Sequence, residues 1–309
     1  MRSFSTDNRL IEFIFYGNYF YGLCTVALCI ESSLQQSLPL NTPLFYLLVF
    51  CTTVMYYTKA YTTDVSADAI NKRTRWYALH RSTVKTSQWL MLLLTLGLGC
   101  GIFWTDYQNI FKADVWEWAL LLLFPCVAGL YYGVNSRLFG RYSLRDKGWL
   151  KPFVIGFTWA GFVTVYPVLY YCMSRGLAYQ PPNLSLFLFL KNFIFITILC
   201  IMFDIKDYAS DYHQHVNTFV VKLGLRRTIF YVLLPITLLS LVTFVIFVLY
   251  EHLYPLRILL NTIPIILLFF VGYSMRLRRS TLYYLVVVDG MMLVKAAFGI
   301  LAMLLSYSA

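Results

Sequence analysis

The 309-residue sequence is 60% hydrophobic and only 13% charged. A soluble domain carries roughly 25% charged residues, so this composition excludes an ordinary soluble protein and predicts a surface that faces lipid. The net charge of +11 also suits nucleic acid, but short basic loops beside membrane spans explain it better, through topology and anionic headgroups. We therefore expect membrane lipid as a partner and no nucleic acid.

Nine apolar runs follow one another along the chain, each close to the roughly 20 residues that a helix needs to cross a bilayer. These predicted spans are 9–31, 43–62, 86–105, 116–135, 152–173, 184–203, 229–250, 255–274 and 281–306. The runs are continuous rather than alternating, which favours helices over barrel strands. The sequence predicts an all-α, polytopic membrane protein whose residues 1–309 form a single transmembrane helical domain, with no removable signal peptide.

Basic residues are distributed very unevenly between the two faces that nine spans would define. The N-terminus and every second loop hold 20 of the 25 lysines and arginines. The remaining five are Lys112, Arg175, Lys191, Arg257 and Lys295. By the positive-inside rule, this asymmetry predicts a cytoplasmic N-terminus in an integral membrane protein, as in a bacterial-type inner membrane.

Two short segments on the predicted cytoplasmic face, 59–81 and 204–222, contain five of the 14 acidic residues. Asp64 and Asp68 are four residues apart, and Asp204, Asp207 and Asp211 follow at spacings of three and four. On a helix each set forms one stripe in which like charges repel, so a cation between them is expected. Paired carboxylates suit Mg²⁺, which is commonly shared with substrate phosphates. The alternative is that these are solvated charges at helix ends.

The two segments resemble the signatures of the UbiA superfamily of membrane-embedded prenyltransferases. The family's first motif, N-D-x-x-D-x-x-x-D followed by I-N-K-x-x-R-P, is similar to residues 60–76, AYTTDVSADAINKRTRW. Its second motif, D-x-x-D-x-x-x-D with an internal basic residue and a later T-x-x-x-x-x-G, is similar to residues 204–224. The matching positions there are Asp204, Lys206, Asp207, Asp211, Thr218 and Gly224. Nine spans with both motifs on the cytoplasmic side are also the family's architecture.

The resemblance implies Mg²⁺-dependent transfer of a polyprenyl group from a polyprenyl diphosphate to a small-molecule acceptor. It implies Asp64, Asp68, Asp207 and Asp211 as catalytic residues that bind the metal, with Asp204 as a supporting ligand. It further implies diphosphate contacts from Arg75, Arg137, Lys206 and Asn18.

Three positions depart from the first motif: Ala60 and Tyr61 replace the usual Asn and Asp, and Trp76 replaces the usual Pro. These departures leave a catalytically silent membrane protein or a transporter as one alternative. Another is transfer of a phosphosugar onto a polyprenyl phosphate, because the same carboxylates would serve that reaction.

Overall fold

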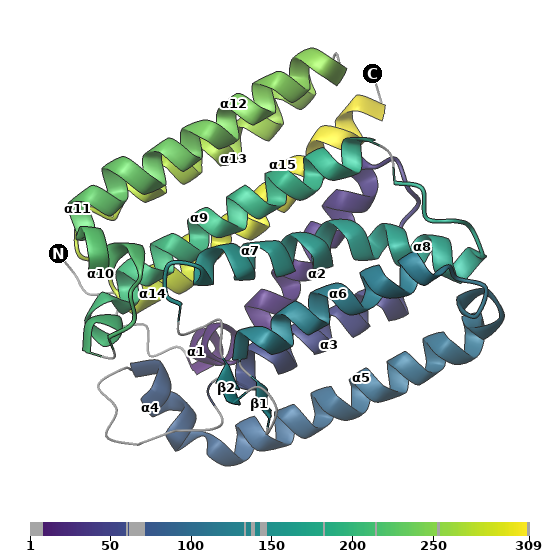
Figure 1. Cartoon of the computed structure of the whole chain (residues 1–309), viewed down its shortest axis with the longest axis horizontal. Helices are drawn as coiled ribbons and strands as arrows, with labels where there is room; N and C mark the ends of the chain where they lie inside the picture. Colours follow the sequence, from purple (N-terminus) through teal and green to yellow (C-terminus); the bar gives the residue numbers. More distant parts are fainter. Residues whose placement is uncertain are drawn as a thin grey trace. The chain divides into compact units, whose positions relative to one another are not determined.

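The computed structural model describes residues 9–59, 61, 72–132, 134–136, 140–142, 147–181, 183–213, 215–251 and 254–307 (Figure 1). The chain divides into two compact units. Unit 1 comprises Met1–Ala27 and Asn41–Gln108, and unit 2 comprises Leu28–Leu40 and Asn109–Ala309. The expectation of a single domain stays a prediction.

Among the described residues, each predicted span is helical over most of its length, with a break at Gly17 and Asn18 and a strand at 134–135. Continuous apolar runs require this in lipid, where the backbone must bond to itself. The first half of the chain forms α1 (Arg9–Tyr16), α2 (Tyr19–Gln35), α3 (Pro43–Lys59), α4 (Lys72–Leu79), α5 (Arg81–Ile110) and α6 (Val115–Tyr132). The middle forms α7 (Lys151–Ala160), α8 (Tyr166–Arg175), α9 (Asn183–His213), α10 (Phe219–Leu223) and α11 (Leu225–Thr228). The last part forms α12 (Leu234–Glu251), α13 (Pro255–Ser274), α14 (Thr281–Tyr283) and α15 (Gly290–Tyr307). Single π-helical turns join α7 to α8 (Gly161–Val165), α11 to α12 (Ile229–Leu233) and α14 to α15 (Tyr284–Val288).

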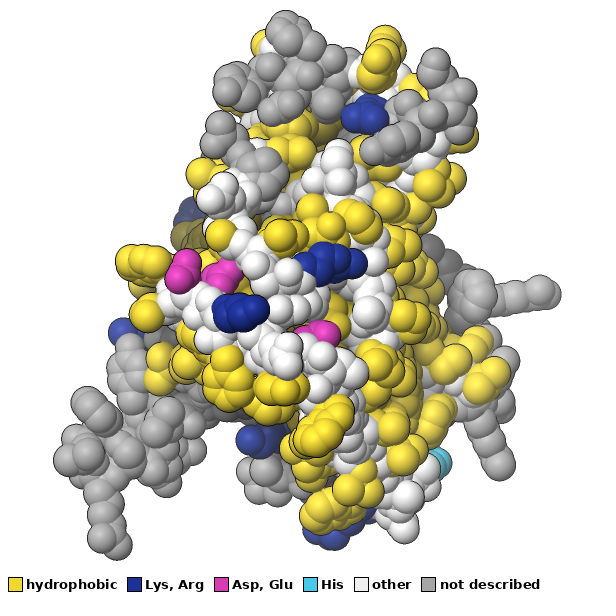
Figure 2. Space-filling view, turned by 90° about the vertical axis from the view of Figure 1, so that its right-hand side faces the viewer, with side chains coloured by type: hydrophobic (Ala, Val, Ile, Leu, Met, Phe, Trp, Pro, Cys, Tyr) yellow, Lys and Arg dark blue, Asp and Glu magenta, His cyan; other side chains and the backbone are white. Residues whose placement is uncertain are grey.

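Several of these helices have the length and composition to cross a bilayer. Among the described residues, six are long and apolar enough, and a seventh span results if the bent pair α1–α2 is one crossing. The helix Val115–Tyr131 is apolar but shorter. Hydrophobic side chains also dominate the face shown in Figure 2, with few charges among them. The chain is therefore an all-helical, multi-pass membrane protein, while the count of nine crossings and their orientation stay predictions.

One short hairpin interrupts the helical pattern. The strands β1 (Val134–Ser136) and β2 (Gly140–Tyr142) pair antiparallel between α6 and α7, with Val134 opposite Tyr142. Hydropathy did not predict it, because strands of three residues are too short to show alternation. The bundle nevertheless remains all-α in class.

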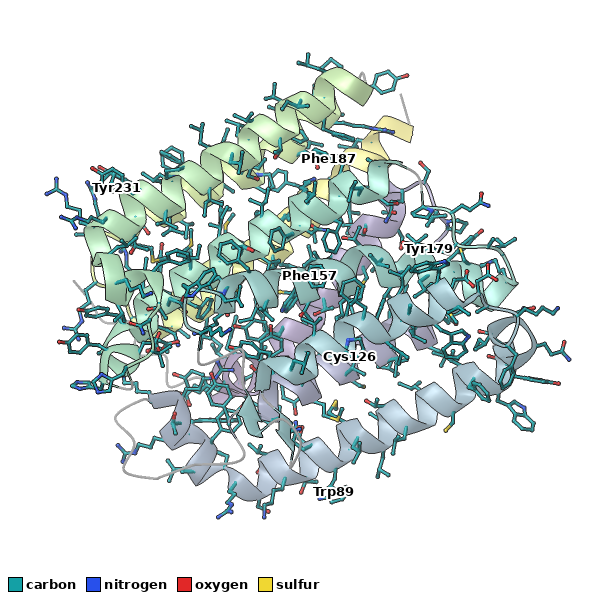
Figure 3. The ribbon with its side chains drawn as sticks, in the orientation of Figure 1. Trp89, Cys126, Phe157, Tyr179, Phe187 and Tyr231 are labelled. Atoms are coloured by element: carbon teal, nitrogen blue, oxygen red, sulfur yellow. The ribbon has the colours of Figure 1, made fainter. Side chains whose placement is uncertain are left out.

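Within unit 2, α9 contacts both α7 and α12 (Figure 1). A side chain at Gly156 of α7 would collide with Thr197 of α9, so the glycine permits close approach of the two helices. On the α12 side, Phe187 of α9, labelled in Figure 3, stacks on Phe247 with ring centroids 3.9 Å apart. This packing fixes the helix that carries the second acidic segment.

In unit 1, the predicted first span is broken at Gly17 and Asn18. The axes of α1 and α2 differ by 62°, and Asn18 has a φ of 65°. This left-handed conformation is one that asparagine adopts more readily than most residues. At the break, the carbonyl oxygens of Tyr16 and Gly17 accept hydrogen bonds from side chains of α3 and α4.

Candidate active site

The second acidic segment forms the last turns of α9, and its three aspartates differ in burial. Asp204 is fully buried and Asp211 is 9% exposed, whereas the Asp207 side chain is 34% exposed. Residues at i, i+3 and i+7 share one side of a helix, so the predicted stripe is present in unit 2. The middle carboxylate, Asp207, is the accessible one, and the carboxylates before and after it are buried.

Asp204 forms an ion pair with a lysine of α7. Lys151, the first residue of α7, donates from Nζ to Asp204 Oδ1 at 2.8 Å. The other carboxylate oxygen, Oδ2, is buried and has no hydrogen-bond partner among the described residues. A buried carboxylate with one open oxygen is costly in a protein interior, and such an atom is suited to binding a further cation.

The remaining residues of the second motif have clear local roles. Lys206 Nζ lies 2.9 Å from Asp207 Oδ1, and its ammonium lies over the Phe203 ring at 5.4 Å. Thr218 caps α10 by accepting a hydrogen bond from the Val221 N–H. Gly224 has a φ of +80° between α10 and α11, a conformation that favours glycine. Thr218 and Gly224 therefore begin and end the short helix α10 that follows the aspartates.

In unit 1, Asn18 is the centre of a buried polar network. Its Nδ2 donates to Thr58 Oγ1 and to the Tyr77 hydroxyl, both at 3.0 Å. Its Oδ1 accepts a hydrogen bond from the Arg73 guanidinium, which also donates to the Tyr16 carbonyl oxygen at 3.1 Å. The Asn18 amide is therefore occupied by protein partners, and its contact with diphosphate stays a prediction.

The same network anchors α4 to the break between α1 and α2. The Tyr77 hydroxyl donates to the Tyr16 carbonyl oxygen at 2.7 Å, and burial raises the pKa of Tyr77 to about 12, so the donor proton is retained at neutral pH. The Arg73 guanidinium lies 4.4 Å from the centroid of the Tyr61 ring, which stacks on Tyr77 at 4.9 Å. Tyr61 and Arg73 are thus in contact although they are twelve residues apart in the sequence.

Three of the predicted site residues, Asp64, Asp68 and Arg137, lie outside the described residues. Arg75 is exposed on α4. Within the described part of the chain, no three His, Cys, Asp or Glu side chains gather closely enough to hold a metal ion. The α9 aspartates alone therefore do not form a complete metal site.

A second buried ionic cluster was not foreseen. Glu31, in the last turns of α2, is 1% exposed, and Lys295 of α15 donates to its Oε2 at 2.6 Å. Lys191 of α9 lies 3.9 Å from the other carboxylate oxygen and donates to Asn261 at 2.8 Å. The sequence signal was available, because Glu31 falls at the edge of a predicted span, where a charge needs a partner.

Searches of protein-family models and of curated proteins find no match to this sequence. Among solved structures, the chain is similar to digeranylgeranylglyceryl phosphate synthase, a UbiA-family prenyltransferase, with a TM-score of 0.55. The alignment covers 96% of this chain and 97% of the other, at 14% sequence identity. At that identity the likeness establishes the fold, and the chain is thus a multi-pass membrane protein with a UbiA-like fold.

Proposed function

We propose that this protein transfers a polyprenyl group from a polyprenyl diphosphate to a small-molecule acceptor in a Mg²⁺-dependent reaction. The observation that carries the proposal is the buried Asp204 carboxylate, whose Oδ2 has no hydrogen-bond partner among the described residues, in a stripe with Asp207 and Asp211. The UbiA-like fold supports this use of the stripe, and the first acidic segment supplies a second pair of carboxylates in the sequence.

The donor atoms fit a hard divalent cation. Carboxylate oxygens are the ligands that Mg²⁺ prefers, and Mg²⁺ usually keeps several waters while bridging to phosphate. Asp207 and Asp211, with Asp204 in support, would hold it from α9, and Asp64 and Asp68 would complete the set. When bound, Mg²⁺ would stabilise the negative charge that develops on the departing diphosphate.

Cationic side chains would bind the diphosphate oxygens directly. Arg75 is exposed on α4, and a guanidinium offers two parallel N–H donors to a phosphate. Lys206 is already held beside Asp207, where its ammonium balances carboxylate charge before substrate binds. Arg137 is the third proposed contact. A lipid-embedded site also keeps water from the allylic cation that forms when the carbon–oxygen bond breaks.

The proposal predicts that purified protein in lipid nanodiscs releases diphosphate from geranylgeranyl diphosphate when a lipid-extract acceptor pool and Mg²⁺ are present. Asp64→Ala and Asp207→Ala should each reduce release to background, because each removes a metal ligand and the two cannot replace one another. Release of inorganic diphosphate is followed with a coupled phosphatase assay, and chelation by EDTA should abolish the signal.

Asp106→Ala is the matched control, because this aspartate lies near the end of α5, away from both acidic segments in the sequence. It should retain activity. Full turnover by both Asp64→Ala and Asp207→Ala would refute the site assignment. Turnover with a nucleotide-activated phosphosugar and a polyprenyl phosphate, but none with a polyprenyl diphosphate, would refute the reaction class.

A further inference from the structure

A short connection between α13 and α14, residues 275–280, lies in unit 2 near the end of α9 that carries the aspartates. It contains Arg276, Arg278 and Arg279. The π-helical turn that follows α14 contacts α9 (Figure 1). Tyr284, the first residue of this turn, meets Phe203 of α9 with ring centroids 6.0 Å apart. Because Phe203 directly precedes Asp204, the connection leads to the acidic stripe.

The connection has a defined shape, because its two ends are bonded to each other. The Tyr283 hydroxyl of α14 lies 2.9 Å from Ser274 Oγ at the end of α13. Ser280 caps α14 by accepting a hydrogen bond from the Tyr283 N–H. The arginine side chains therefore start from fixed backbone positions.

Arg279 is held against the tyrosines that lie next to α9. Its Nε donates to the Ser274 carbonyl oxygen at 3.3 Å, and its guanidinium carbon lies 4.9 Å from the centroid of the Tyr283 ring. Arg279 and Asp207 both lie close enough to the Tyr284 hydroxyl for their charges to act on it. The guanidinium and the accessible carboxylate of α9 therefore belong to one local cluster.

Arg276, three residues earlier, is held elsewhere. Its guanidinium donates to the Tyr273 hydroxyl and lies 4.1 Å from the centroid of that ring. Tyr273 in turn meets Phe230 of the π-helical turn Ile229–Leu233 edge-on, with ring centroids 6.5 Å apart. The two arginines of one connection are thus attached to different tyrosines, and Arg279 is the one beside the acidic stripe.

The terminal nitrogens of Arg279 are available to a ligand. Among the described residues, no carboxylate forms an ion pair with Arg279 and no acceptor is bonded to its Nη1 or Nη2. The residue is only partly buried, so these donors can be reached. A guanidinium presents parallel N–H groups that bind phosphate oxygens in pairs. A phosphate group beside the α9 aspartates is therefore a suitable ligand.

We propose that Arg279 binds the diphosphate of the polyprenyl donor beside the metal ligands of α9. This inference rests on the proposed function, and it adds a phosphate contact from the last part of the chain, outside both acidic segments. The guanidinium would hold the diphosphate while negative charge develops on it, and a fixed cation at that position stabilises the transition state.

Isothermal titration of the full chain in lipid nanodiscs with inorganic diphosphate and Mg²⁺ tests the contact without requiring turnover. Arg279→Met should weaken binding by roughly tenfold to hundredfold, as expected for charged hydrogen bonds to one phosphate group. Arg279→Lys should bind with intermediate affinity, because it keeps the charge but loses the planar fork. The KM for geranylgeranyl diphosphate should rise in the same order in the assay of diphosphate release.

Arg276→Met and Arg278→Met are the matched controls, since each removes one arginine from the same connection. Both should bind diphosphate as the native protein does, and thermal unfolding in detergent should show that all four variants are folded. Equal weakening in the three methionine variants, or native affinity in Arg279→Met or Arg279→Lys, would overturn the contact and leave the proposed function intact. Absence of Mg²⁺-dependent diphosphate binding by the native protein would instead overturn the proposed function and this contact with it.

Discussion

Glu31→Ala is expected to lower the free energy of unfolding by about 3–5 kcal/mol, the usual cost of removing one partner from a buried ion pair. The substitution leaves Lys295, whose side chain is 4% exposed, without its hydrogen-bonded carboxylate. It also removes the acidic group nearest to Lys191, so two ammonium groups remain in a membrane-spanning part of unit 2. Uncompensated charge in such a setting is expensive.

The packing around Glu31 also indicates that its carboxylate contributes to stability. A side chain at Gly299 of α15 would collide with the Glu31 carboxylate, so the glycine leaves the space that this carboxylate occupies. The ion pair therefore connects the last turns of α2 to α15, and Gly299 of α15 leaves room for the carboxylate. Gln35 adds a further bond, because its Nε2 donates to Glu31 Oε1 at 3.1 Å.

Thermal unfolding in detergent, followed by tryptophan fluorescence, measures the effect. The double variant Glu31→Ala, Lys295→Met should be more stable than Glu31→Ala alone, because replacing both partners leaves fewer unpaired charges. Lys222→Ala, at an exposed position, is the control and should melt as the native protein does. A Glu31→Ala variant with the native melting temperature would contradict a stabilising role for the pair.

Asp204→Asn is expected to reduce diphosphate release by about 10²–10³-fold, the range found when one electrostatic contact to a transition state is lost. The substitution preserves the size of the side chain while removing a proposed supporting ligand of the metal. It also leaves Lys151 without its charged partner at 2.8 Å, so part of the loss comes from lower stability. A second variant is needed to separate the two effects.

The exchange Lys151→Asp, Asp204→Lys separates them, because it keeps one cation and one carboxylate facing each other while moving the carboxylate from α9 to α7. We expect this variant to recover much of the stability lost in Asp204→Asn, measured by thermal unfolding, and to remain inactive in the diphosphate assay. Native-like turnover in the exchanged protein would show that Asp204 acts only as a structural partner of Lys151.

The sequence was sufficient to predict the helices, because a continuous apolar run of bilayer length has no alternative in lipid. It did not predict the break at Asn18, where a left-handed residue is stabilised by Thr58, Tyr77 and Arg73. Those partners come from α3 and α4, 40 residues or more along the chain, and no local pattern reports such contacts. The first span therefore appears in the sequence as one helix, although the structure contains two.

The second acidic stripe was predictable for the same local reason, since spacings of three and four define a helix face. Its pairing with Lys151 was not, because it depends on the close approach of α7 to α9 at Gly156. The same holds for Glu31 and Lys295, which are 264 residues apart. Charges inside or beside apolar runs indicate that partners exist, whereas tertiary packing decides which residues they are.

In the proposed site, carboxylates of the two acidic segments together bind Mg²⁺ against a lipid-tailed diphosphate. Isothermal titration of the purified protein with a non-cleavable thiodiphosphate analogue of the donor, with and without Mg²⁺, measures this binding. We predict saturable binding only when Mg²⁺ is present, and loss of that binding in both Asp64→Ala and Asp207→Ala. Equal affinity with Mg²⁺ and with EDTA, unchanged in both variants, would contradict the claim.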